Sequence, residues 1–386
     1  MIKRTLERKL KQLINVFSIV SVTGPRQSGK TTLIKSVFPN LPYVSLENPD
    51  DRQFAQNDPR GFLDNYPSGA VFDDIQRTPD LFSYLQGIVD ENKSIKYILS
   101  GAQNFLLSER ISQSLAGRVG IVKLMPFSMS ELNDANLLST DFKEVAYKGF
   151  YPIIFDHKIP PEDFYPNYVQ TYVERDVRQL TQVGDLNVFS TFLKLCAGRV
   201  GQLLNMSELA NDSGISVNTV KSWLTILESS YIVFRLYPHH KNFNKRLIKM
   251  PKLYFYDTGL LNYLLGIRLP SQIQIHFAKG AIFENLIVGE FIKKRFHQGK
   301  EPNLYFWRDH KGKEIDLIVE DGSSLIPIEI KSGSTKKGEY FKGMDYWNSL
   351  SENNPKKSYV IYGGKENQIR SNGKLLSWKS IIDYDF

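Results

Sequence analysis

The stretch SIVSVTGPRQSGKTTLI, residues 18–34, decides the fold of the N-terminal part of the chain. Its first residues are mostly β-branched or small and predict a buried strand, and the Thr-Leu-Ile run at its end predicts the start of a helix. Between them, GPRQSGKT matches the pattern G-x-x-x-x-G-K-[ST] at every fixed position. The stretch therefore predicts a strand, a phosphate-binding loop and a helix, which together are typical of a P-loop fold.

The residue types in this loop suit a nucleoside triphosphate. Gly24 and Gly29 let the loop curl so that backbone N–H groups face phosphate oxygens, and the dipole of the following helix favours their negative charge. Lys30 can reach the β- and γ-phosphates, and the Thr31 hydroxyl can bind Mg²⁺. We therefore expect ATP and Mg²⁺ as ligands. The predicted nucleotide contacts are Gly24, Pro25, Arg26, Gln27, Ser28, Gly29, Lys30, Thr31 and Thr32.

A second acidic element lies at residues 70–76, AVFDDIQ, where an apolar strand ends in two carboxylates. Asp73 is predicted to hold Mg²⁺ through water, and Asp74 is predicted to orient the attacking water. The alternative is a strand that runs into an acidic turn without a catalytic role. The intact P-loop upstream favours the catalytic interpretation.

Two further apolar runs complete a predicted sheet. Residues 96–101 form a strand with a polar exit, at which Ser100 and Gln103 are predicted to sense the γ-phosphate, although any strand-to-loop exit is polar. Residues 119–124 form the next run, and helix-like stretches alternate with these strands. The pattern predicts a doubly wound, mostly parallel α/β sheet.

Five segments of the chain together resemble a family of bacterial and archaeal AAA-type ATPases. They are GPRQSGKTT, FDDIQ, LSGAQNFLL, SLAGRV and GFYP, and they occur in the family's order. The resemblance covers nearly the whole chain and implies an ATPase with a C-terminal domain of uncertain function. It also makes Arg118, in SLAGR, a candidate for stabilising the transferring phosphoryl group, either in its own chain or from a neighbour in a homo-oligomer. The alternative for Arg118 is a surface role.

The chain departs from this family at one position. The family usually has Asp-Glu where this chain has Asp73-Asp74. The shorter second side chain withdraws its carboxylate by about an ångström, and a misplacement on that scale can slow catalysis. We therefore expect secure ATP binding and slow hydrolysis.

Residues 206–227, MSELANDSGISVNTVKSWLTIL, have the pattern of a helix-turn-helix. Ser207 and Ser216 are predicted N-caps, and Gly214 is predicted to end the first helix. The stretch 241–252 has five basic residues and no acid, as the wing of a winged helix could. The segment is either a DNA-binding module or a packing module. In the first interpretation, the residues that face the major groove are Ser216, Asn218, Thr219, Lys221 and Ser222.

Separated carboxylates and a lysine form another candidate site near the C-terminus. Asp316, followed after about a dozen residues by Glu329-x-Lys331, resembles the core of PD-(D/E)XK nucleases. Glu329 and Lys331 share one strand face because they are two residues apart. With Glu284 from a preceding helix, Asp316 and Glu329 are predicted to bind a divalent cation, and Lys331 to activate water. The alternative is a nuclease-like fold that binds its partner without cutting.

Composition limits the remaining classes of function. The net charge of +8 permits nucleic-acid binding without requiring it. A single cysteine, Cys196, excludes an internal disulfide and a Cys-rich zinc site, and is expected to be a small buried hydrophobe. No apolar run approaches the roughly 20 residues of a membrane helix, which indicates a cytoplasmic protein with no membrane partner.

These predictions divide the chain of 386 residues into three domains. They are a P-loop ATPase domain at 1–160, a helical winged-helix domain at 161–250, and a restriction-endonuclease-like α/β domain at 251–386. The predicted function is a slowly hydrolysing ATPase whose C-terminal half binds or processes nucleic acid, with DNA favoured. The alternative is a nucleotide-dependent switch that binds a protein or nucleic-acid partner without cleavage.

Overall fold

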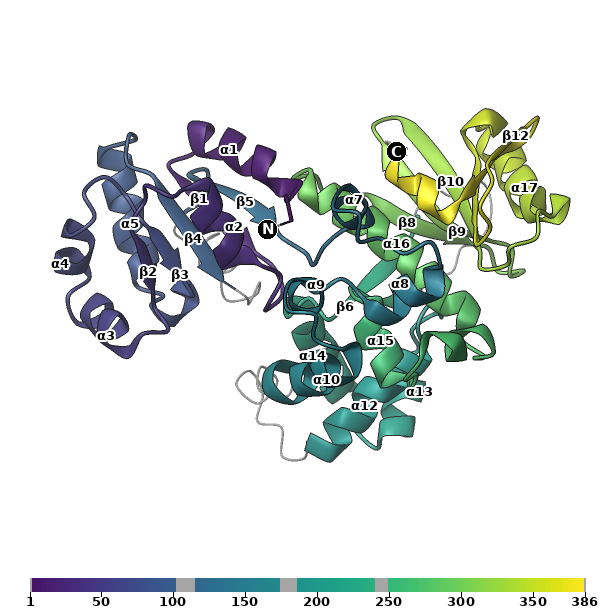
Figure 1. Cartoon of the computed structure of the whole chain (residues 1–386), viewed down its shortest axis with the longest axis horizontal. Coiled ribbons are helices and arrows are strands. Elements are labelled where there is room, and N and C mark those ends of the chain that lie inside the picture. The colour runs from purple at the N-terminus through teal and green to yellow at the C-terminus, as the bar shows by residue number, and fades with distance from the viewer. Residues whose placement is uncertain (1, 102–114, 174–185, 240–248, 385–386) are drawn as a thin grey trace.

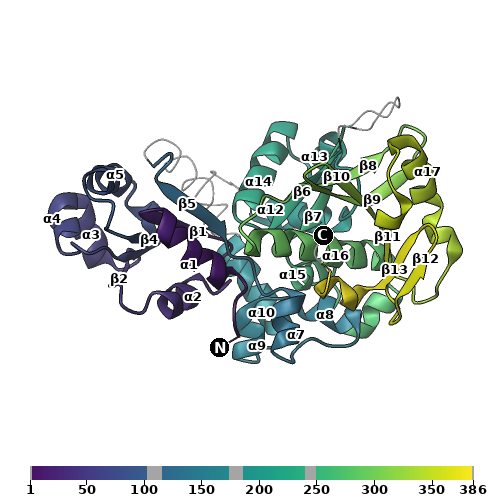
Figure 2. The ribbon, with the colours of Figure 1, turned by 90° about the horizontal axis from the view of Figure 1, so that it is seen from above.

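The computed structural model describes residues 2–101, 115–173, 186–239 and 249–384. Figure 1 shows two lobes of unequal size: an N-terminal lobe built on one sheet, and a larger lobe that joins a helical region to a second sheet. The view from above in Figure 2 shows the same two lobes, with the N-terminus at their junction. The first helix, α1 (Leu6–Val16), therefore starts where the lobes meet.

Five parallel strands form the sheet of the N-terminal lobe, in the order β2-β3-β4-β1-β5. Strand β1 is buried along its whole length because β4 and β5 flank it and helices cover both of its faces. The predicted α/β fold with a parallel sheet is confirmed. The strands are β1 (Ile19–Thr23), β2 (Tyr43–Ser45), β3 (Val71–Asp73), β4 (Tyr97–Gly101) and β5 (Val119–Lys123).

Helices cover both faces of this sheet. Helices α1 and α2 (Lys30–Val37) share one apolar layer with Val20 and Val22 of β1. Ile19 joins the other layer, because successive side chains of a strand point to opposite faces. All strands run the same way, so their carboxyl ends, and the loops that follow them, lie at one edge. The helices of the second layer are α3 (Pro49–Asn57), α4 (Pro59–Asp64) and α5 (Leu81–Glu91).

A helical region follows the N-terminal lobe. Its predicted helix-turn-helix is present as α13 and α14, separated by Gly214 at φ 68°. Ser216 caps α14 as predicted, accepting from the N–H of Thr219 at 3.1 Å. The predicted cap at Ser207 is wrong: Asn205 caps α13, because the helix already begins at Met206. The helices are α7 (Met129–Asp134), α8 (Phe142–Lys148), α9 (Pro152–Asp156), α10 (Pro161–Tyr168), the π-helical turn η2 (Val169–Val173), α12 (Leu186–Gly198), α13 (Met206–Ser213) and α14 (Val217–Ser229).

Eight strands form the second sheet, in the order β12-β13-β11-β10-β9-β8-β6-β7. The boundary predicted at residue 250 falls between β6 and β7, which are antiparallel partners, so the sheet extends across it. Helix α16 (Lys279–His297) packs against this sheet and also reaches β5 of the N-terminal lobe. The strands are β6 (Val233–Pro238), β7 (Lys252–Phe255), β8 (Leu304–Arg308), β9 (Glu314–Asp321), β10 (Ser324–Lys331), β11 (Tyr359–Tyr362), β12 (Gln368–Arg370) and β13 (Gly373–Ser377).

The other helices of this part are α15 (Thr258–Leu264) and α17 (Lys342–Ser351), with short 3₁₀ turns between the elements. Cys196 is fully buried in the core that the helical region shares with this sheet, as expected for a small hydrophobe. Within the described ranges, none of the helices is long and apolar enough to cross a membrane.

Candidate nucleotide site and C-terminal carboxylate cluster

The predicted phosphate loop joins β1 to α2. Gly24 adopts φ 148°, and a Cβ there would lie 2.1 Å from the carbonyl oxygen of Leu124. Gly29 adopts φ 89° and precedes the first residue of α2. Both positions therefore require glycine, because their φ angles are positive. Gly24 requires it also because the backbone of Leu124 lies too close for a Cβ atom.

Lys30 lies inside the curl of this loop and is largely buried. Its ammonium donates to the carbonyl oxygens of Gly24 at 2.9 Å and Pro25 at 2.8 Å. Among the residues that the structure describes, the buried hydroxyl of Ser28 has no hydrogen-bond partner. A buried cation, this hydroxyl and the N-terminus of α2 fit the phosphates of a nucleotide. Thr32 follows in the first turn of α2.

Thr31 and Asp73 meet at the carboxyl edge of the sheet. Thr31 Oγ1 donates to Asp73 Oδ2 at 2.7 Å, and the hydroxyl of Tyr43 donates to the same oxygen at 2.6 Å. Burial alone would raise the pKa of Asp73, but these hydrogen bonds and the charge of Lys30 outweigh it and lower the pKa. Asp73 is therefore held as a carboxylate beside the threonine, which suits the two residues to bind Mg²⁺. The sequence did not indicate Tyr43.

Asp74 follows Asp73 in a left-handed conformation, at φ 55°. Gln76 Nε2 donates to its Oδ1 at 2.7 Å. Burial, followed by the charges of Asp73 and Glu47, raises the pKa of Asp74 above its ordinary value. The two neighbouring carboxylates thus differ in environment, since Asp73 is stabilised in its charged form and Asp74 is not.

The other predicted site residues of the ATPase domain do not all lie near the P-loop. Ser100 is buried at the end of β4, paired in register with Asp73. Gln103 lies outside the described residues. Arg118 lies next to Val119, which pairs with Ile19 at the start of β1, whereas the P-loop follows the end of β1. Its guanidinium binds Asp90 through two hydrogen bonds, of 2.6 and 2.9 Å. The structure thus does not bring Arg118 to the P-loop of its own chain.

A buried arginine connects the P-loop to the larger lobe. Arg4 donates to the carbonyl oxygen of Ser28 at 2.8 Å, to that of Met125 at 2.6 Å, and to Glu131 Oε1 at 3.2 Å. His297, from α16, accepts from the N–H of Met125 at 3.3 Å. The charges of His297 and Arg4, with backbone hydrogen bonds, overcome burial and lower the pKa of Glu131 to about 2. Burial lowers the pKa of His297 to about 4.

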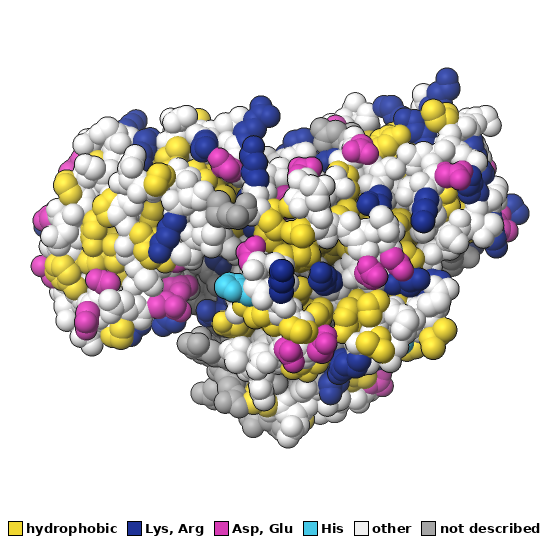
Figure 3. Space-filling view, viewed as in Figure 1, with side chains coloured by type: hydrophobic (Ala, Val, Ile, Leu, Met, Phe, Trp, Pro, Cys, Tyr) yellow, Lys and Arg dark blue, Asp and Glu magenta, His cyan; other side chains and the backbone are white. Residues whose placement is uncertain are grey.

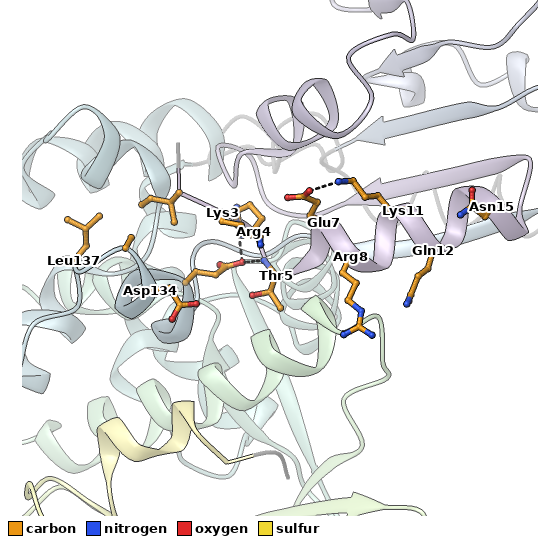
Figure 4. Close-up of a pocket in the computed structure, with 13 residues that line it drawn as sticks. Lys3, Arg4, Thr5, Glu7, Arg8, Lys11, Gln12, Asn15, Asp134 and Leu137 are labelled. Atoms are coloured by element: carbon orange, nitrogen blue, oxygen red, sulfur yellow. Dashed lines mark hydrogen bonds and ion pairs between the residues drawn. The ribbon is translucent and has the colours of Figure 1, made fainter.

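A groove of about 930 Å³ opens over this arginine, between α1 and the segment at 131–137 (Figure 4). Arg8 and Gln12 extend from one side of α1, and Glu7 and Lys11 form an ion pair on the other. No residue of the P-loop lines the groove. It is therefore separate from the nucleotide site, to which Arg4 connects it.

Two tyrosines of the larger lobe also contact the ATPase part. The hydroxyls of Tyr231 and Thr23 are hydrogen-bonded at 2.8 Å, and Gln27 Nε2 donates to the hydroxyl of Tyr172 at 2.9 Å. The Arg26 guanidinium lies 5.6 Å from the centre of the Tyr172 ring. The loop predicted to bind phosphate is thus in direct contact with the rest of the chain.

The C-terminal candidate residues meet on β9 and β10. Lys331 Nζ lies 2.6 Å from Glu329 Oε2 and 3.2 Å from Asp316 Oδ2, and the N–H of Ile330 donates to Asp316 at 2.7 Å. Burial and the charge of Asp316 raise the pKa of Glu329, while the lysine charges hold that of Asp316 low despite burial. The strand alternation predicted for this trio is present.

Glu284 is part of a different set of contacts. Its Oε1 accepts from Lys252 at 3.0 Å and from the Tyr254 hydroxyl at 2.5 Å. Lys252 is nearly fully buried and also binds Glu314 at 2.5 Å. The residues that the structure describes contain no group of three or more acidic, histidine or cysteine side chains able to hold a metal ion. Lys252 pairs with Glu284, and Lys331 pairs with Asp316 and Glu329, so a shared cation on the three carboxylates stays a prediction.

The predicted wing is only partly described. Residues 240–248, with Lys245 and Arg246, lie outside the described ranges. Lys252 was counted among the wing's basic residues, but it is buried in ion pairs within the sheet and cannot contact a phosphate backbone. On α14, Ser216, Asn218 and Lys221 are exposed, as a DNA-facing surface requires.

Three family models match successive parts of the chain. A model described as an AAA domain matches residues 16–133, and two models described as domains of unknown function match residues 139–271 and 279–381. Rv2008c of Mycobacterium tuberculosis and Mb2031c of Mycobacterium bovis are each 30% identical over 339 residues, which are 86% of this chain and 74% of theirs. The chain belongs to the family of these mycobacterial proteins.

More distant similarities extend to another bacterial protein and to a solved structure. A protein of Haemophilus influenzae is 22% identical over 364 residues, 84% of this chain and 86% of that protein. The solved Walker-type ATPase paby2304 of Pyrococcus abyssi is 14% identical, with a TM-score of 0.47 over 68% of this chain and 96% of that one. The region that matches the AAA domain contains the P-loop and the strand that ends in Asp73. This match identifies residues 16–133 as an ATPase domain of the AAA type.

Proposed function

We propose that the protein binds ATP·Mg²⁺ at the P-loop and hydrolyses it slowly. The contact between Thr31 and Asp73 carries the proposal, because it joins the P-loop to the acidic strand end within 2.7 Å. Lys30 exchanges its carbonyl partners for phosphate oxygens, and Asp74 orients the attacking water. Mg²⁺ supplies neutralising charge for the phosphates when it is bound there.

The short side chain at position 74 provides a test of this proposal. Asp74→Glu, which adds one methylene, is expected to preserve turnover or raise it by about tenfold, and Asp74→Asn to lower it at least tenfold. Steady-state phosphate release by the full chain measures both, with the exposed Asp80→Asn as a control. If the glutamate variant loses hydrolysis while the asparagine variant keeps it, Asp74 is not the water-orienting group.

Contacts between the lobes support a coupling of nucleotide state to the C-terminal half. Thr23, Gln27 and Ser28 bind Tyr231, Tyr172 and Arg4, so a change in the loop alters contacts across the junction. We propose nucleic acid as the partner of the larger lobe, with DNA favoured. The exposed polar side chains of α14 support this partner, because a recognition helix contacts DNA through such side chains.

Surface charge does not by itself locate the partner site. On the face drawn in Figure 3, basic side chains are spread over both lobes and interspersed with acidic ones. A protein partner for a nucleotide-dependent switch is therefore the alternative. Arg118 remains a candidate for action on a neighbouring copy in a homo-oligomer, since its side chain is partly exposed beside Asp90.

Cleavage is a second candidate function for the larger lobe. The convergence of Asp316, Glu329 and Lys331 favours a PD-(D/E)XK-like site in which the two carboxylates take a divalent cation. Mg²⁺- or Mn²⁺-dependent nicking of plasmid DNA, with and without ATP, tests it. Cleavage is expected to disappear in Lys331→Ala and to persist in Lys336→Ala, whose lysine forms an exposed ion pair. Absence of cleavage on duplex DNA, single strands and RNA favours the binding function.

A further inference from the structure

The carboxyl ends of β2 and β3 emerge side by side. Ser45 and Asp73 are partners in the parallel register. The N–H of Leu46 donates to the carbonyl oxygen of Asp73 at 3.0 Å, which continues the pairing beyond the end of β2. The next residues of the two segments, Glu47 and Asp74, therefore leave the sheet as neighbours, at the edge where the P-loop lies.

Other residues also contact Glu47 and Asp74. Arg52 donates to the carbonyl oxygen of Glu47 at 3.3 Å, and Arg77 Nη2 lies 3.4 Å from Glu47 Oε1. Gln76 donates to Asp74 on its other side. Burial, followed by the charges of Asp73 and Glu47, raises the pKa of Asp74, as expected for carboxyl groups that lie close together.

An ion pair with Arg77 does not account for this arrangement. The side chains of Arg77 and Glu47 are 30% and 53% exposed, and ion pairs of that kind contribute little to stability. A carboxylate placed against a second carboxylate costs stability, because the like charges repel. Glu47 could bind Arg77 without touching Asp74. Titratable groups held together at a cost are typical of functional sites.

We infer that Glu47 is a second carboxylate of the hydrolytic site and acts with Asp74 on the attacking water. The inference rests on the proposed ATPase function. Glu47 supplies, from the neighbouring strand, the longer side chain that position 74 lacks. During hydrolysis the water oxygen bonds to the γ-phosphorus, the bond from that phosphorus to the bridging oxygen breaks, and ADP leaves with the electron pair. The proton of the water passes to the Glu47–Asp74 pair.

Replacing Glu47 by glutamine in the full chain tests this inference. Turnover in Glu47→Gln is expected to fall about a hundredfold, the usual contribution of a positioned base. ATP affinity in the same variant is expected to stay within about threefold, because Glu47 does not belong to the phosphate loop. Arg77→Gln is the matched control, since it breaks the ion pair and keeps the carboxylate; its turnover should also stay within about threefold.

One further readout separates catalysis from a structural role. The exchange Glu47→Asp with Asp74→Glu keeps one long and one short carboxylate and should retain at least about a tenth of the turnover.

The outcomes distinguish this inference from the proposed function. Normal turnover in Glu47→Gln, or equal losses in Glu47→Gln and Arg77→Gln, overturns the role of Glu47 and leaves the ATPase intact. A parent chain that binds no ATP, or binds it without turnover, overturns the proposed function and this inference with it.

Discussion

Arg4→Ala is expected to lower the free energy of unfolding by about 3 to 5 kcal/mol, the loss typical of removing one partner of a buried ion pair. The variant leaves the buried carboxylate of Glu131 without its arginine partner. It also removes the hydrogen-bond donor of the Ser28 and Met125 carbonyl oxygens. Denaturant unfolding of the full chain measures the effect. Arg8→Ala, which removes an exposed arginine of α1, is the control and should change stability by less than about 0.5 kcal/mol.

A double variant separates lost charge from lost packing. Replacing Arg4 by methionine and Glu131 by leucine removes both charges, and it should recover part of the stability that either single change loses. Equal unfolding midpoints for Arg4→Ala and Arg8→Ala would contradict the assignment of Arg4 as the buried connection between the lobes.

The ATPase site is largely predictable because its residues are close in sequence and follow a fixed geometry. A β-branched strand followed by GPRQSGKT specifies the loop from Gly24 to Thr31, and an apolar strand ending in acid specifies Asp73. Parallel strands share one carboxyl edge, so these two motifs meet once the sheet forms. The structure confirms that meeting through the bond between Thr31 and Asp73.

The residues that the sequence did not reveal act through long-range contacts. Tyr43 reaches Asp73 across 30 positions of sequence, and Arg4 reaches Glu131 across 127. In the sequence, Arg4 is one of several basic residues near the N-terminus, and nothing local marks it as buried. Glu47 belongs to no motif, and only the pairing of β2 with β3 places it beside Asp74.

The C-terminal prediction was correct about the strands, whereas its metal ligands stay a prediction. Alternation along β10 fixes Glu329 and Lys331 on one face, which periodicity can predict. The position of Lys252 depends on the pairing of β7 with β6. The run of basic residues at 241–252 did not predict this pairing. Lys252, predicted as part of an exposed wing, is thus a buried partner of Glu284 and Glu314.

Lys30→Ala is expected to weaken ATP·Mg²⁺ binding at least about a hundredfold. The lysine is the buried cation in the curl of the loop, and its present partners are backbone carbonyls that a phosphate can replace. Losing a charge-assisted contact to phosphate in a largely buried site costs several times more than losing a neutral hydrogen bond. Lys11→Ala, which removes an exposed lysine of α1, should leave the affinity unchanged.

Isothermal calorimetry of the full chain with ATP in the presence of Mg²⁺ tests the central claim most directly. The account predicts saturable binding of one ATP per chain, lost in Lys30→Ala and kept in Lys11→Ala. Equal ATP affinities for the parent and Lys30→Ala, or no binding by the parent, would contradict the assignment of residues 24–31 as the nucleotide site.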